Sequence, residues 1–177
     1  WENLPIALYP DKLGLIFSGS AIVDKQNTSG FGTKNNPPLV AMFTYHLMEG
    51  EKAGRKDFQY QGIAYSTDNG RNWTKYEKNP VIPNTENLKD FRDTKLFWNE
   101  RQKNWSVVFA VGDHVRFYNS PNLKDWKTGT LAFVGSTITT ATGLPQAALD
   151  QIKSLFGTGW TLAADTLRTL GKVSLPT

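Results

Sequence analysis

Hydrophobic and polar positions alternate over short runs in residues 1–126, and turn residues rich in Asn, Gly and Pro separate these runs. Runs of about four to eight residues bounded in this way are typical of β-strands. The segment from Leu39 to Tyr45 is apolar at odd and even positions alike, which is typical of a strand buried on both faces. The pattern predicts strands over Gly19–Val23, Leu39–Tyr45, Gln61–Ser66, Lys95–Trp98, Trp105–Val111 and Val115–Ser120.

These strands belong to an internal repeat. One unit runs from Trp1 to the segment Phe-Ser-Gly-Ser that begins at Phe17, and the next runs from Trp73 to Phe-Arg-Asp-Thr, which begins at Phe91. The offset is 72 residues between the tryptophans and 74 between the phenylalanines. Trp126 ends a third, shorter interval. Two landmarks with nearly equal offsets indicate a duplicated structural unit.

Each of two tryptophans follows a turn. Residues 66–73 have the pattern Ser-x-Asp-x-Gly-x-x-Trp, and residues 120–126 form a similar segment. In such a pattern the Asp and Gly close a hairpin and the Trp packs beneath the sheet. Four-stranded units separated in this way are typical of the blades of a β-propeller. A β-sandwich with accidental similarity between hairpins is the alternative, and the repeat offsets favour the propeller.

The composition changes near residue 127. Only six charged residues follow Trp126, and no Glu follows Glu100. Residues 128–142 form a strand-like linker rich in Thr and Gly, and apolar positions at helical spacing over 145–156 and 163–170 predict a short α-helical hairpin. We therefore predict an all-β fold with two regions, partial propeller blades over residues 1–126 and a linker with a helical tail over 127–177.

The composition narrows the possible functions. A length of 177 residues suits one domain, and the absence of cysteine excludes disulfides, thiol nucleophiles and thiolate metal sites. Two histidines are too few for a histidine-based metal centre, so we expect no metal and no cofactor. The net charge of +4 is scattered, with no basic stripe for nucleic acid. No apolar run is long enough to span a membrane, so no membrane partner is expected.

Two polar clusters lie at equivalent positions of the two repeat units. They are the candidates for a functional site. Phe17 and Ser18 lie where an innermost propeller strand would face the axial pocket. Arg92 and Asp93 form the second cluster, in which Asp93 could bind sugar hydroxyls while Arg92 orients its carboxylate. A surface ion pair of little energetic value is the alternative, and the repeat favours a site. Tyr45 is a further candidate, because aromatic rings stack on sugars.

Several motifs together resemble glycoside hydrolase family 32, the invertases, levanases and inulinases that cleave β-fructofuranosides. The resemblance covers residues 1–126 and is carried by residues 1–10, 17–20, 27–31, 64–70, 79–82 and 91–93. It implies a five-bladed propeller with an axial site, and a retaining hydrolysis that uses two carboxylates. It assigns substrate binding to Phe17, Ser18, Arg92 and Asp93, while Tyr45 is a substrate-binding candidate only through its aromatic ring. Asp93 matches the carboxylate that binds fructose hydroxyls and stabilises the transition state, although Thr94 replaces the Pro of the family's Arg-Asp-Pro motif.

The two other carboxylates of the family have no counterpart in this chain. Its nucleophile lies in an Asn-Asp-Pro-Asn motif and its acid/base in a Glu-Cys motif, and neither motif occurs here. We therefore expect a fragment of a β-fructosidase, opening in mid-protein at Trp1, that is inactive alone and binds a fructose-containing saccharide weakly or not at all. Unpaired blade edges predict a homo-oligomer. The resemblance favours an extracellular or periplasmic location. The alternatives are a non-catalytic carbohydrate-binding module and a purely structural, self-assembling fragment.

Overall fold

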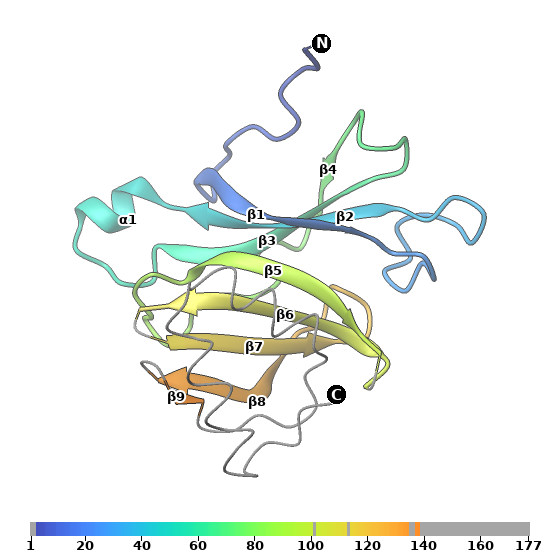
Figure 1. Cartoon of the computed structure of the whole chain (residues 1–177). Helices are drawn as coiled ribbons and strands as arrows, with labels where there is room; N and C mark the ends of the chain where they lie inside the picture. Colours follow the sequence, from blue (N-terminus) through green and yellow to red (C-terminus); the bar gives the residue numbers. More distant parts are fainter. Residues whose placement is uncertain (1–2, 101, 113, 135–136, 139–177) are drawn as a thin grey trace.

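The computed structural model describes residues 3–100, 102–112, 114–134 and 137–138, which form two antiparallel sheets (Figure 1). The first sheet contains β1 (Leu15–Val23), β2 (Leu39–His46), β3 (Gln59–Ser66) and β4 (Thr74–Lys75), in that order. The second contains β5 (Arg92–Asn99), β6 (Asn104–Val111), β7 (His114–Ser120), β8 (Lys127–Val134) and β9 (Thr137–Ile138). Helix α1 (Met48–Lys52) connects β2 to β3.

The described residues confirm the all-β prediction, and each of the six predicted strands lies within an observed strand. The change in composition predicts that the blades end at residue 126. The second sheet continues past this residue, because β8 pairs with β7. The predicted helical hairpin lies outside the described residues. No helix within the described ranges has the length and apolar character needed to cross a membrane.

The main core lies between the two sheets. Side chains on one face of β2, such as Val40 and Met42, pack there against residues of β5 and β6. The opposite face of β2 contributes Phe43 and Tyr45 to a second core, which Leu8 and other residues of the N-terminal segment cover. The prediction that this strand is buried on both faces is therefore confirmed. The main core contains Val40, Met42, Ile63, Ile82, Phe91, Leu96, Trp105, Val107, Phe109, Val111, Tyr118 and Leu123.

Hydrogen bonds join the sheets across this core. The Thr94 hydroxyl donates to the Met42 carbonyl at 3.2 Å, and the Leu96 amide donates to the Ser20 hydroxyl at 2.9 Å. The buried Gln61 amide donates to the Phe91 carbonyl at 2.6 Å. Buried polar groups are costly unless paired, so these bonds fix how far β5 can slide along β1 and β2.

The first strand of each sheet has an irregularity near its start. The pairing of β1 with β2 shifts between Ile16 and Gly19, and the pairing of β5 with β6 shifts between Arg92 and Lys95. A Cβ at position 19 would lie 1.9 Å from the Met42 carbonyl oxygen, so only glycine fits there. The two first strands thus share a bulge, in agreement with the internal repeat.

The two predicted turns also share their geometry. Trp73 donates its indole N–H to the Gly70 carbonyl, and Trp126 donates to the Leu123 carbonyl, both at 2.9 Å. In the first turn Asp68 accepts hydrogen bonds from the Ser66 hydroxyl and from both nitrogens of Asn72. In the second turn the Asn122 side-chain oxygen takes the place of this carboxylate.

We expect Asp68 to make the free energy of unfolding depend on pH in the acidic range. Hydrogen bonds from the Asn72 amide and from neighbouring groups lower the pKa of Asp68 from 3.8 to about 2. The carboxylate therefore stabilises the folded chain above about pH 4, and this contribution is lost as the pH falls through 2. Asp68→Asn should lower the thermal midpoint by a few degrees at neutral pH, and the difference from the original chain should vanish near pH 2.

Thermal denaturation of both chains between pH 2 and 7 measures this difference. Asn122→Asp in the second turn is the matched control, since it introduces a carboxylate where the folded chain uses an amide. A difference for Asp68→Asn that stays constant over this range would contradict the assignment.

Candidate saccharide-binding site

The two bulges bring the predicted clusters together. The Ser18 hydroxyl donates to Asp93 Oδ1 at 3.1 Å, although the two residues are 75 positions apart. The backbone of Asp93 has a φ of +63°, a left-handed conformation that Asp tolerates better than most residues. This conformation lies within the β5 irregularity and accompanies an Asp93 side chain that is half exposed. A hydroxyl and a carboxylate therefore point to one place from the two first strands.

Arg92 is held between acceptors. Its Nη1 donates to Asp90 Oδ1 at 2.6 Å and to Gln59 Oε1 at 3.4 Å, while its Nε lies 3.8 Å from Asp93 Oδ2. A surface ion pair alone would have one partner and little orientation. Here the guanidinium donates to Asp90 and Gln59, and these two bonds hold its positive charge beside the Asp93 carboxylate.

An aromatic wall stands beside these charges. The Phe17 ring stacks on the His46 ring with centroids 4.3 Å apart and an interplanar angle of 9°. The Gln59 amide nitrogen, which can only donate, lies 3.1 Å from His46 Nδ1. His46 Nδ1 therefore accepts, and His46 Nε2 donates to Glu51 Oε2 at 2.9 Å. The ring that supports Phe17 is thus fixed on both edges.

We call these residues the Asp93 cluster, and its exposed atoms suit a saccharide. Phe17 is 38% exposed and Asp93 is half exposed, whereas His46 and Gln59 behind them are buried. A hollow of about 310 Å³ shares His46 with the cluster but is not lined by Phe17 or Asp93. Sugars present both apolar ring faces and hydroxyl groups, which match an aromatic wall and a charged acceptor. The cluster consists of Phe17, Ser18, His46, Gln59, Arg92 and Asp93.

Tyr45 does not join this cluster. It precedes His46 in β2, and successive side chains of a strand point to opposite faces. Its ring is completely buried in the second core, and its hydroxyl donates to Asp11 Oδ2 at 3.0 Å. Burial, followed by this hydrogen bond, raises the pKa of Tyr45 above its ordinary value. The structure thus separates Tyr45 from the four other predicted site residues, which it brings together.

His46 and Gln59 were not among the residues predicted for the site. Gln59 and Gln61 lie in a strand that is otherwise largely buried, and polar residues on a buried face are a usable sequence signal. The partner of Gln59 is Arg92, 33 positions away, which strand patterns do not reveal. Within the described ranges no group of three or more acidic or histidine side chains is placed to hold a metal ion.

Comparison with known proteins gives a match to one family and to several levanases and inulinases. Residues 1–141 match the family described as Glycosyl hydrolases family 32 N-terminal domain. The chain is 56% identical to a levanase of Bacillus subtilis over 126 residues, which cover 71% of this chain and 17% of the levanase. It is 41% identical to the extracellular exo-inulinase of Aspergillus awamori over 145 residues, covering 72% of this chain and 27% of the inulinase.

Solved structures agree with these sequences. The β-fructofuranosidase of Schwanniomyces occidentalis complexed with fructosyl-erythritol is similar with a TM-score of 0.61 and 36% identity, over 76% of this chain and 25% of that one. The exo-inulinase of Aspergillus awamori gives a TM-score of 0.58 and 37% identity, over 70% and 26%. The chain therefore spans about a quarter or less of the length of these relatives. Because the family match covers most of its residues, the chain belongs to glycosyl hydrolase family 32 as a part of that family's N-terminal domain.

Proposed function

We propose that the Asp93 cluster binds the fructosyl unit of a fructan or of sucrose, and that the chain is the substrate-binding part of a β-fructosidase. The observation that carries this proposal is the 3.1 Å hydrogen bond from Ser18 to Asp93, beside the exposed ring of Phe17. The carboxylate has acceptor capacity left for sugar hydroxyls. The phenylalanine ring offers an apolar face to the sugar carbons, and the Arg92 guanidinium places a positive charge 3.8 Å from the carboxylate.

The proposed role of Asp93 is to stabilise the transition state rather than to form or break the glycosidic bond. A retaining glycosidase needs a nucleophile and an acid/base about 5–5.5 Å apart. The carboxylates around the cluster already have partners, because Asp90 binds Arg92 and Glu51 binds His46. The family's nucleophile and acid/base motifs do not occur in these 177 residues. On its own the chain therefore binds without cleaving.

We expect Asp93→Asn to weaken the binding of fructose. The substitution keeps the shape of the side chain and removes the negative charge, and hydrogen bonds to a charged group are worth about 1.5–3 kcal/mol, or a factor of about 10–100 in affinity. Isothermal titration with fructose measures the change. Asp125→Asn alters an exposed carboxylate in the turn after β7 and should leave the affinity unchanged. Equal affinity for the original chain and Asp93→Asn would contradict the proposed site.

We expect the isolated chain to release no fructose from sucrose or levan. Without a nucleophile and an acid/base, neither the covalent step nor the proton transfer can occur. A sensitive assay of reducing sugar measures release over hours, with Asp93→Asn as the blank. Fructose release by the original chain that is absent from Asp93→Asn would show that the chain is an enzyme and would overturn this part of the proposal.

We further propose that the two sheets are neighbouring blades of a five-bladed ring and that the isolated chain associates with itself. β1 is the edge strand of the first sheet and exposes Leu15 and Val23. An exposed apolar edge pairs readily with another strand. Leu4 and Ile6 of the N-terminal segment are more exposed still, at 56% and 65%. A second copy of the chain would cover such surfaces.

We expect light scattering at micromolar concentration to give the mass of a dimer or larger species. Leu15→Lys should shift the distribution towards the monomer, because a lysine on an edge strand opposes pairing. Thr33→Lys adds the same charge on an exposed loop and should change nothing. A sharp monomer mass for the original chain would refute self-association without affecting the sugar site.

A further inference from the structure

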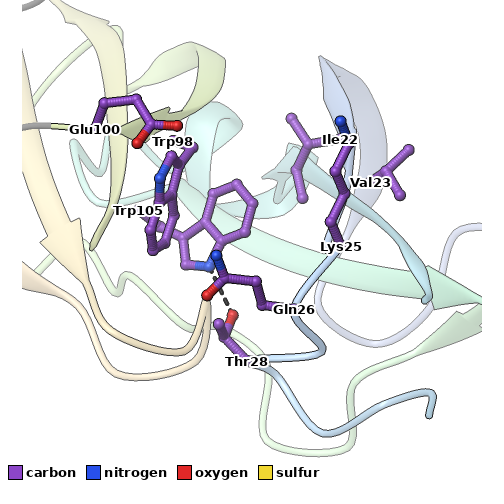
Figure 2. A pocket seen from close by; sticks show the side chains of 8 residues that line it. All are labelled: Ile22, Val23, Lys25, Gln26, Thr28, Trp98, Glu100 and Trp105. Carbon is purple, nitrogen blue, oxygen red and sulfur yellow. Dashed lines mark hydrogen bonds between the residues drawn. The ribbon is translucent and has the colours of Figure 1, made fainter. Parts of the chain in front are cut away.

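A second pocket, drawn in Figure 2, shares no residue with the Asp93 cluster. The cluster is formed near the starts of β1 and β5, whereas this pocket is lined by Ile22 and Val23 at the end of β1 and by Trp98 near the end of β5. Its volume is about 400 Å³, within the range of about 300–1,000 Å³ that is typical of ligand sites. All of its walls come from described residues.

Two tryptophans form one wall, with Trp98 partly exposed and Trp105 only 5% exposed behind it. Trp98 and Trp105 are opposite each other in β5 and β6, and their rings meet edge to face with centroids 5.0 Å apart. The Trp105 indole N–H donates to the Thr28 hydroxyl at 2.7 Å, as the dashed line in Figure 2 marks. Thr28 is itself fixed by Asp24, which is fully buried and accepts from its amide and hydroxyl. The aromatic wall is therefore held rigidly before any ligand arrives.

Polar side chains surround this wall. Lys25 and Gln26 are exposed, and neither has a hydrogen bond or ion pair with another described residue. Glu100 lies opposite and is bound by Lys103 at 2.9 Å. This hydrogen bond, together with one from Trp98, holds the pKa of Glu100 below its usual value, so the carboxylate is charged at neutral pH. The pocket thus offers an amide, an ammonium and a carboxylate around an apolar face.

We propose that this pocket, which we call the Trp98 pocket, is an accessory saccharide-binding site that takes a sugar unit of a fructan chain. The aromatic wall covers the apolar face of a sugar, and the amide and the two charged groups bind its hydroxyls, as donors and as acceptors. Lys25 and Glu100 give the rim charges of both signs, which suits a neutral polar ligand, whereas a purely apolar ligand would use neither group. The substrate class rests on the proposed function, whereas the pocket is separate from the Asp93 cluster.

Nuclear magnetic resonance of the 15N-labelled chain tests the proposal with the trisaccharide 1-kestose as the probe. We expect the indole signals of Trp98 and Trp105 to shift during a millimolar titration. Gln26→Ala changes an exposed side chain that the fold does not need, and it should weaken this response at least about threefold. Gln102→Ala removes an exposed glutamine outside the pocket and should leave the response unchanged.

Asp93→Asn separates this proposal from the previous one. If the Trp98 pocket binds sugar, the two indole signals shift in Asp93→Asn with the same midpoint as in the original chain. Signals that do not move, or that move only when Asp93 is intact, overturn the accessory site. Loss of fructose binding in Asp93→Asn, measured in the same samples, tests the Asp93 cluster independently. An unchanged response in Gln26→Ala would also contradict the proposed polar rim.

Discussion

The packing of β5 against β1 and β2 is the constraint on which the other features depend. The two sheets enclose one apolar core, and three hydrogen bonds that cross it fix the relative position of their first strands. Residues separated by more than 70 positions then meet, as Ser18 and Asp93 do at one end and Thr28 and Trp105 at the other. The internal repeat therefore has a physical meaning, because it places similar strands side by side.

The backbone has unusual conformations where the polar cluster forms, as it has at several turns elsewhere. Gly19 passes so close to the Met42 carbonyl that no side chain fits, and Asp93 has a left-handed backbone. A left-handed residue other than glycine costs about 1–3 kcal/mol and persists only when its surroundings hold it in place. Ser18 and Arg92 contact the same carboxylate from two sides. The direction of the Asp93 side chain therefore depends on the packing of the two sheets and not only on the local sequence around Asp93.

The sequence predicted the parts of the structure that follow from periodicity and turn chemistry. Six strands and the two Trp-containing turns could be read from alternation and from Asp68, Gly70 and their counterparts. The sequence did not predict the hydrogen bond between Ser18 and Asp93 itself. It predicted only that the two residues occupy equivalent positions in the repeat units. Gln59 and His46 were missed, since their roles depend on a contact between β3 and β5. Tyr45 was grouped with the site because an aromatic residue type does not indicate on which face of the strand the side chain lies.

The two ends of the strand pair differ in how complete their binding surfaces are. At the Asp93 cluster, Phe17 and Asp93 remain 38% and 50% exposed, so a sugar bound there would keep much of its surface in water. Ligand sites commonly bury 70–90% or more of a small ligand. The Trp98 pocket has walls from both sheets of this chain, and its rim of Val23, Lys25, Gln26 and Glu100 is exposed. A polymer that touches both ends gains from the second contact without needing strong binding at either, since the first contact raises the local concentration of the second. Weak individual sites in this chain are therefore compatible with appreciable binding of a long fructan.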